Sequence, residues 1–450
     1  MLEFLFTRTP LRYMVDSFWR DEAFTWLLAK QNLPGILNTT AQDFNPPFYY
    51  VIIHNWMNIF GTSEVAIRSF SLLMYCVGCF AVYEHFKNIL KTSHRRAIVY
   101  TLLLILNPLV LYYAFEGRMY STLFALAMVS SYFFLTGKNR AYLAVTVAGL
   151  WTHLFMGLVV VTQILFYLIE HNLWKKSSKK QETVRLPYML GSIALVIPWL
   201  IFFLSQNRAV QNGFWVSYLQ LGDYILLPGY LFTGIYKDYW APVFQVATLR
   251  QYLYLTSLLF TLIAGVALTL RAQSMQVLRV RRYYLYLAFI PIAAVVFVSF
   301  FQPLFVPRYL VMASAALSVL AILILHDLSR PWQLVFGLIV AAVAIQGQLF
   351  QLEYRDKGSM RELSFELRQL MNESTVIYVE SELDLIEAQY YFGENRVYLY
   401  GVQYETIPHY VGKVLIPKSR IRTEVPKFPG RAIIISNVGK RDYRIESTFF

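Results

Sequence analysis

The stretch RDEAFTWLLAKQNLPGILNTTAQDFNPPFYYVIIHNWMNIF, residues 20–60, decides how the rest of the chain is organised. It places three acids, Asp21, Glu22 and Asp43, among aromatic and apolar residues, ahead of a long series of apolar segments. Carboxylates beside a bilayer are costly unless they have a function. We therefore expect residues 20–64 to form an acidic loop on the outer membrane surface, with two short amphipathic helices. Its carboxylates should face a cavity that the following membrane spans cover.

The composition is that of a membrane protein. Of 450 residues, 57% are hydrophobic and 15% are charged, whereas a soluble protein averages about 25% charged residues. The aromatic content of 17% suits a chain with many membrane interfaces, and a large aromatic core is the alternative. The net charge of +13 does not indicate nucleic acid, because the Lys and Arg residues are concentrated in short loops between apolar runs. We expect membrane lipids as partners and no nucleic acid.

Apolar runs long enough to span a bilayer, or nearly so, recur about ten times after the acidic loop. They cover residues 65–86, 97–115, 119–136, 140–152, 154–171, 186–205, 249–270, 284–302, 307–326 and 332–350. Residues 1–19 form neither a convincing span nor a leader, so we expect a first span that is missing ahead of Met1. The segment from Pro46 to Gly61 is too short to span, and predicts an interfacial helix.

Three basic loops predict the orientation of the chain. Their positive residues are Lys87, Lys91, Arg95 and Arg96; Lys175, Lys176, Lys179, Lys180 and Arg185; and Arg271, Arg279, Arg281 and Arg282. Such loops are typically cytoplasmic. Alternation then places the acidic loop, the corners at 116–118 and 302–307 and the 206–247 loop together on the opposite face. The unusual polar residues therefore collect on one side, which favours an active site outside the cytoplasm.

From Glu353 onward charges become frequent. A helical pattern at 359–371 precedes four strand-like runs, VIYVE (376–380), VYLY (397–400), KVLIP (413–417) and AIIIS (432–436). We expect an α-helical polytopic membrane protein over residues 1–352, followed by a small α/β extracytoplasmic domain over residues 353–450.

The acidic loop offers more than one carboxylate to a site at the membrane surface. An ionised carboxylate can act as general base for an acceptor hydroxyl or amine, and a neighbour can orient it or tune its pKa. The alternative is that Asp21 and Glu22 only complement the dipole at the start of a helix.

Two further sets of residues suggest an anion site. Glu116, Arg118 and Tyr120 in YYAFEGRMYS, and Arg308 with Tyr309 in FVPRYLVM, fall at the outer ends of predicted spans. A guanidinium there could bind a phosphate bidentately, with a Tyr hydroxyl as a further donor. The alternative is that they are interface anchors.

Other polar residues carry weaker signals. His153 in LWTHLFMG could donate to a phosphate or a sugar, or could be a satisfied core residue. Arg68, at the start of a span, is explained by snorkelling. The sequence shows no Walker pattern, no GxGxxG, no Cys/His metal cluster and no DxD pair. We expect no cofactor, although the nearby carboxylates leave a divalent cation open, and we expect a donor that resides in the membrane.

Several segments together resemble the C-type membrane glycosyltransferases. They are DEAFTWLLA (21–29), DFNPPFYYVIIHNW (43–56), FGTSEVAIRSFSLL (60–73), EGRMYS (116–121), THLFMG (152–157) and PRYLVMASAALSVL (307–320). The nearest relatives would be bacterial members similar to protein O-mannosyltransferases and lipid A aminoarabinose transferase. The resemblance covers roughly residues 16–330, and the acidic loop is its most specific part.

This resemblance implies a polyprenyl-phosphate-linked sugar donor, an external active site and inversion at the sugar carbon by single displacement. It implies that Asp21 is the catalytic base, that Glu22 is its acidic partner and that Asp43 is a second loop carboxylate. Arg118, Tyr120 and Arg308 would line the donor cavity. The acceptor would be a glycan, a lipid or a protein of the cell envelope.

Two other classes of protein remain as alternatives. A polytopic transporter or lipid flippase should show internal repeats and charges near the middle of the membrane. A non-catalytic sensor should not depend on Asp21.

Overall fold

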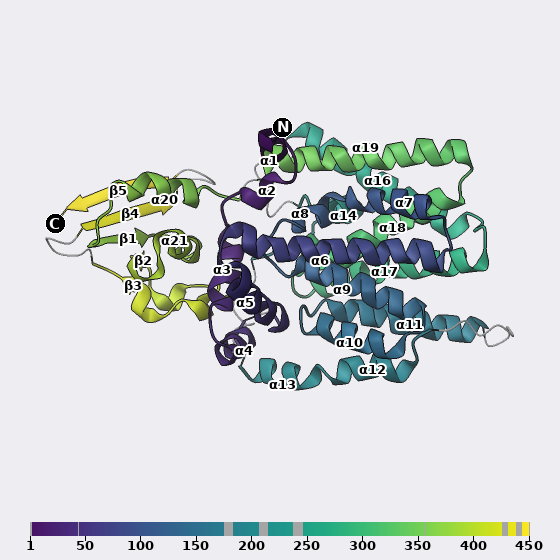
Figure 1. Ribbon diagram of the computed structural model, residues 1–450, viewed down its shortest axis with the longest axis horizontal. Coiled ribbons are helices and arrows are strands. Elements are labelled where there is room, and N and C mark those ends of the chain that lie inside the picture. Colours follow the sequence, from purple (N-terminus) through teal and green to yellow (C-terminus); the bar gives the residue numbers. More distant parts are fainter. Residues whose placement is uncertain are drawn as a thin grey trace.

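The protein has a helix bundle at one end and a small α/β domain at the other, with the N-terminal helices between them (Figure 1). The computed structural model describes residues 2–43, 45–174, 183–206, 215–236, 246–355, 357–424, 431–437 and 443–449. The N-terminal part contains α1 (Leu2–Arg8), α2 (Arg12–Val15), α3 (Arg20–Ala29), α4 (Leu33–Ala41) and α5 (Phe48–Phe60). Helix α5 is the predicted short helix. It begins after Pro47 and ends at Gly61, whose φ of +88° favours glycine.

The bundle is formed by the apolar runs. It contains α6 (Glu64–Glu84), the π-helical turn η1 (His85–Ile89), α7 (His94–Ile105), α8 (Pro108–Tyr113), α9 (Tyr120–Leu135), α10 (Asn139–Leu150), α11 (Met156–Trp174), α12 (Leu186–Ala194), α13 (Ile197–Gln206), α14 (Leu221–Thr233), α16 (Ala247–Thr269), α17 (Met275–Ser299), the 3-10 turn η4 (Pro307–Leu310), α18 (Val311–Asp327) and α19 (Arg330–Tyr354).

Among the described residues, six helical segments are long and apolar enough to cross a membrane by length and composition. They are Glu64–Ile89, Leu186–Ser205, Ala247–Thr269, Met275–Ser299, Pro307–Asp327 and Arg330–Tyr354. The other four predicted runs are helical but shorter. The run at 97–115 is divided because Pro108 has no N–H to continue the helix, and the Asn107 side chain caps the new helix at the Val110 N–H.

Helix α18 lies at the centre of the bundle. Nearly all of its side chains are buried, and it packs against α17, α16, α9 and α14. The turn η4 precedes it, so Arg308 and Tyr309 lie at the end of the bundle that faces α3. The central helix therefore fixes two of the predicted site residues at that end.

The C-terminal domain is a five-stranded sheet with helices on one face. Its elements are α20 (Met360–Arg368), β1 (Thr375–Val379), α21 (Leu385–Phe392), η5 (Glu394–Arg396), β2 (Val397–Tyr400), η6 (Tyr404–Thr406), η7 (His409–Val411), η8 (Lys413–Leu415), η9 (Lys418–Arg420), β3 (Ile421–Arg422), β4 (Arg431–Asn437) and β5 (Tyr443–Phe449). The strand order is β3-β2-β1-β4-β5, in which only the β4–β5 pair is antiparallel.

Three of the predicted strands and the predicted helix are confirmed, and one strand prediction is wrong. The run KVLIP forms the 3-10 turn η8, because Gly412 turns the chain at a φ of +83° and the Lys413 ammonium group donates to the Ile407 carbonyl at 3.0 Å. The sequence prediction also missed β5, whose mixed polar residues do not look like a buried strand.

The C-terminal domain is attached to the N-terminal segment and to the start of α6 by specific bonds. The Tyr391 hydroxyl accepts from the Phe18 N–H at 2.6 Å and donates to Glu64 at 2.9 Å, and Arg361 donates to the Val15 carbonyl at 2.6 Å. Because helix α21 packs on α3, this domain lies beside the acidic stretch.

The first and third basic loops lie at the opposite end of the bundle. The connections from α6 to α7 and from α16 to α17 are both at the end away from the C-terminal domain (Figure 1). Most of the middle basic loop, residues 175–182, lies outside the described residues. The described basic connections and the acidic stretch are thus separated by the length of the bundle.

Candidate active site

One pocket lies where α3, the α8–α9 turn, the start of α11 and η4 meet the C-terminal domain. All the predicted site residues except Glu22 and Glu116 line it. The full lining is Arg20, Asp21, Phe24, Asp43, Asn45, Arg118, Tyr120, His153, Leu154, Phe155, Phe203, Trp215, Leu304, Arg308, Tyr309, Tyr410, Val411 and Gly412. Residues far apart in the sequence therefore form a single site with a polar and an apolar side.

Asp21 is held by two arginines in this pocket. One of its carboxylate oxygens lies 3.0 Å from Arg20 Nη2, and the other lies 3.2 Å from Arg308 Nη1. Burial alone would raise the pKa of Asp21, but the guanidinium groups of Arg20, Arg308 and Arg118 outweigh burial and lower it. Asp21 is therefore held as a carboxylate by its arginine partners.

Arg118 lies beside the backbone of the same helix. Its Nη1 donates to the Asp21 carbonyl at 3.2 Å, to the Thr25 hydroxyl at 3.3 Å and to the Tyr50 hydroxyl at 3.4 Å. Its Nε is buried and finds no acceptor among the described residues. A buried guanidinium with an unused donor in a pocket is suited to bind an anion.

Arg308 is surrounded by aromatic rings. Its guanidinium carbon lies 5.6–5.7 Å from the ring centroids of Trp19, Tyr120, Trp215 and Tyr309. These rings hold the cation at a fixed place and exclude water from it. Tyr120 and Tyr309 therefore contribute to the pocket as cation–π partners of Arg308.

Asp43 and His153 complete the polar side of the pocket. The Asn45 amide is 3.5 Å from the Asp43 carboxylate. Burial, together with the nearby Arg118 and Arg308, lowers the pKa of His153 to about 3, so its ring is neutral at physiological pH. Its Nδ1 accepts from the Phe155 N–H at 3.1 Å, which leaves the proton on Nε2 as a donor.

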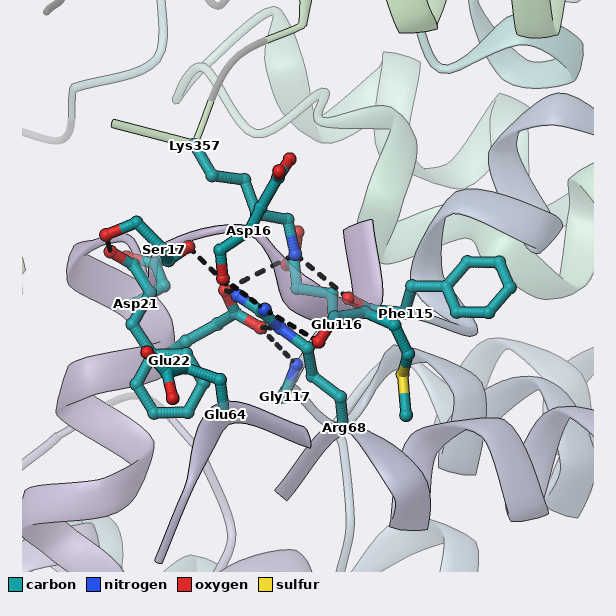
Figure 2. Close-up of polar contacts among 12 residues, drawn as sticks. Asp16, Ser17, Asp21, Glu22, Glu64, Arg68, Phe115, Glu116, Gly117 and Lys357 are labelled. Atoms are coloured by element: carbon teal, nitrogen blue, oxygen red, sulfur yellow. Dashed lines mark hydrogen bonds and ion pairs between the residues drawn. The ribbon is translucent and has the colours of Figure 1, made fainter. Parts of the chain in front are cut away.

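Glu22 does not line the pocket, although it follows Asp21 directly. It is 0% exposed and accepts from Arg68 through both oxygens, at 2.7 and 2.6 Å. The Gly117 N–H donates to it at 2.7 Å and the Lys357 ammonium group at 3.3 Å (Figure 2). Burial disfavours its charge, but Arg68 and Lys357 together lower its pKa.

The prediction that Arg68 snorkels to the membrane surface is wrong. It does not snorkel, because it is 0% exposed and its remaining donors reach the backbone carbonyls of Asp16 at 2.6 Å and Ser17 at 3.0 Å. It therefore joins α6 to the segment that leads into α3. Its partner Glu22 is 46 residues away in the sequence, so no local spacing indicates this role.

Glu116 lies behind the pocket with this buried group. It is 0% exposed, and its carboxylate oxygens accept no hydrogen bond from the described residues. Arg355 Nη2 is 4.0 Å away, at the outer limit of an ion pair, and burial raises the pKa of Glu116. The predicted role of Glu116 in binding substrate is not supported by this position.

Sequence reasoning missed several pocket residues. Arg20 is the neighbour of Asp21 and could have been included on that ground. Trp215 lies in a long loop, and Tyr410, Val411 and Gly412 come from the C-terminal domain. No spacing in the sequence indicates that this domain reaches the acidic stretch.

The described residues contain no group of three or more His, Cys, Asp or Glu side chains arranged to hold a metal ion. Asp21 is occupied by guanidinium groups, and Glu22 by Arg68. Metal dependence stays a prediction, which a chelator can test.

Comparison with known proteins shows which proteins this chain resembles. A family model described as dolichyl-phosphate-mannose-protein mannosyltransferase matches residues 45–202. No curated protein sequence matches the chain. The chain is a multi-pass membrane protein, and its predicted resemblance to the C-type membrane glycosyltransferases is confirmed.

Two solved structures share its fold. The crystal structure of ArnT from Cupriavidus metallidurans in the apo state is 15% identical, with a TM-score of 0.61 over 94% of this chain and 90% of that chain. The structure of the same protein bound to undecaprenyl phosphate is 14% identical, with a TM-score of 0.59 over 97% of this chain and 93% of that chain. At these identities the similarity establishes the fold.

Proposed function

We propose that this protein is an inverting glycosyltransferase that moves a sugar from a polyprenyl-phosphate donor to an acceptor outside the cytoplasm. The observation that carries the proposal is a single pocket in which Arg20, Arg118 and Arg308 surround Asp21, next to an apolar wall. Cations outnumber acids there, so the pocket favours an anion with an apolar tail. The fold supports this choice, since ArnT with the same fold has been crystallised with undecaprenyl phosphate.

In the proposed reaction the lipid phosphate lies against Arg118 and Arg308. The acceptor oxygen or nitrogen attacks the anomeric carbon from the side opposite the phosphate and transfers its proton to Asp21. The bond from that carbon to the phosphate oxygen breaks as the new bond forms, and the bonding electrons leave with the phosphate. The two guanidinium groups stabilise the charge of the leaving phosphate.

The donor also activates the base. Asp21 is a weak base while only its arginine partners contact it, because they lower its pKa. A bound phosphate shares Arg308 with Asp21 and brings its own negative charge, so the pKa of Asp21 rises and proton transfer becomes easier. The neutral His153 can donate from Nε2 to the sugar or the phosphate.

The apolar and aromatic residues of the pocket suggest how the substrates are oriented in it. Leu154, Phe203 and Leu304 come from the bundle and suit the polyprenyl chain. Tyr410 and Gly412 come from the C-terminal domain, on the far side from the bundle, and suit the sugar or the acceptor. The acceptor is then a glycan, a lipid or a protein that approaches beside this domain.

The proposed activity is tested by measuring sugar transfer directly. The protein in lipid nanodiscs is incubated with radiolabelled undecaprenyl-phosphate sugars of several types and with lipid, glycan and protein fractions from the cell envelope. We expect label in one acceptor fraction together with equimolar release of undecaprenyl phosphate. A lipid flippase would move the intact donor across the membrane without release, and that outcome would reject the transferase.

The proposed location outside the cytoplasm needs a separate test. Lys418→Cys lies in the C-terminal domain and Arg271→Cys at the opposite end of the bundle, and both parent residues are exposed. In intact cells a membrane-impermeant maleimide should label the first and spare the second. The reverse pattern would place the pocket in the cytoplasm.

A further inference from the structure

Lys357 is a buried lysine between the bundle and the C-terminal domain. It follows α19 and is 4% exposed. Its ammonium group lies 3.3 Å from a Glu22 carboxylate oxygen and donates to the Phe115 carbonyl at 2.9 Å (Figure 2). The sequence analysis gave no role to this residue.

The two partners of Lys357 belong to the two segments that face the pocket. Glu22 is next to Asp21 in α3, and Phe115 belongs to the α8–α9 turn that carries Arg118. The Gly117 N–H makes the same connection from the turn to Glu22. A single ammonium group therefore helps to fix the base relative to a cation of the pocket.

We propose that Lys357 is a positioning residue for the transfer reaction: by binding Glu22 and the Phe115 carbonyl, it holds Asp21 and Arg118 in their reactive arrangement. The proposal rests on the proposed function. Lys357 does not line the pocket, so it would act only through these neighbours. Displacement of a reacting group by about 1 Å can cost as much as 100-fold in rate.

The charge of Lys357 is essential to this role. Burial and, to a smaller extent, Arg68 lower the pKa of Lys357, Glu22, Glu116 and Asp16 oppose the decrease, and the resulting pKa is about 8. The Tyr112 ring also lies 5.4 Å from the ammonium group. As the pH rises through about 8 the proton is lost, and the bond to Glu22 weakens. Transfer should then decline with a reversible alkaline limb.

Three variants test the proposal with the donor that supports transfer. Lys357→Met removes the charge and keeps the length of the side chain. Lys357→Arg keeps a charge that no accessible pH removes. Lys418→Met is the control, since it removes an exposed lysine of the C-terminal domain. For each protein we measure kcat and donor KM from pH 6 to 9.5, the unfolding temperature and the binding of undecaprenyl phosphate.

We expect Lys357→Met to reduce kcat by roughly 10–100-fold while donor KM and undecaprenyl phosphate binding change less than about twofold. Lys357→Arg should restore a large part of kcat at pH 7 and lose the alkaline limb near pH 8. Lys418→Met should match the wild type.

Several results would overturn the proposal. If the kcat of the wild-type protein does not decline at alkaline pH, the proposal is rejected, even if the variants fail to fold. A folded Lys357→Met with full activity would also reject it, as would a Lys357→Arg protein with the wild-type pH profile. A wild-type protein that binds no undecaprenyl phosphate and transfers no sugar would instead reject the proposed function.

Discussion

Asp21 and Glu22 are consecutive residues of one helix, and they have opposite surroundings. Successive side chains on a helix point about 100° apart, so Asp21 faces the pocket and Glu22 faces the buried group formed with Arg68 and Lys357. The pocket acid contacts guanidinium groups that a ligand can share. The buried acid contacts donors that also hold three parts of the chain together. In the proposed reaction Asp21 therefore takes part in the chemistry, whereas Glu22 helps to position the parts of the chain around it.

Removing the pocket acid should give the largest effect. Asp21→Asn keeps the shape of the side chain but cannot accept the acceptor proton, so transfer should fall by roughly 10²–10⁴-fold. The unfolding temperature should stay close to that of the wild type, and undecaprenyl phosphate binding should persist because Arg308 loses a competing partner. Transfer at more than a tenth of the wild-type rate would remove Asp21 from the role of base.

Removing the buried acid should act on stability instead. Glu22→Gln leaves Arg68 charged and 0% exposed without its carboxylate, and breaking such a buried pair costs about 3–5 kcal/mol. The unfolding temperature, followed by tryptophan fluorescence, should therefore fall strongly. Glu405→Gln removes an exposed acid and is the matched control. If both variants unfold together, the buried group does not hold the fold.

Removing a cation of the pocket should weaken donor binding. Arg308→Ala should raise the Kd for undecaprenyl phosphate by about tenfold or more, which corresponds to about 1.4 kcal/mol. Arg308→Lys should recover only part of the affinity, because an ammonium group lacks the guanidinium fork. Quenching of Trp19 and Trp215, which lie beside Arg308, reports binding directly. An unchanged Kd for Arg308→Ala would exclude phosphate contact by this residue.

A smaller effect is expected from the wall that the C-terminal domain contributes. Gly412 has a φ of +83°, and an added Cβ would lie 2.7 Å from the Phe24 ring. Gly412→Ala should move this loop away from α3 and reduce transfer by a few fold, with undecaprenyl phosphate binding unchanged. Gly401→Ala has a similar φ, +72°, but meets no atom within 4 Å. Equal loss in both variants would attribute the effect to backbone strain rather than to the wall.

Chelation should have the smallest effect. Guanidinium groups occupy the Asp21 carboxylate and can balance the donor phosphate, so we predict that EDTA leaves initial rates of transfer within about twofold of the untreated enzyme. Loss of activity that is restored by Mg²⁺ or Mn²⁺ would show that a cation assists the reaction.

Much of the pocket could be predicted from the sequence. The basic loops predicted the orientation of the chain, and this orientation places the acidic loop and the corners at Arg118 and Arg308 on the same face of the membrane. The spacing of apolar runs located the helices of the bundle. The division between Asp21 and Glu22 could not be predicted, since both acids look equivalent in the chain. Nor could the partners Arg68 and Lys357, because packing between distant segments leaves no periodic signal.

The errors in the C-terminal domain have a similar origin. KVLIP has the composition of a strand, yet Gly412 and the bonds made by Lys413 fold it as a turn. The contribution of Tyr410 to the pocket depends on how the domain packs on α3, which the sequence of neither segment indicates.

The most direct test of the different roles of Asp21 and Glu22 is the structure of this protein with undecaprenyl phosphate bound. We predict that its phosphate oxygens lie about 2.7–3.2 Å from guanidinium nitrogens of Arg118 and Arg308, beside Asp21, and that Glu22 is still bound to Arg68 and Lys357. A phosphate bound elsewhere, or a Glu22 carboxylate that turns into the pocket to meet it, would contradict the division of roles between the two acids.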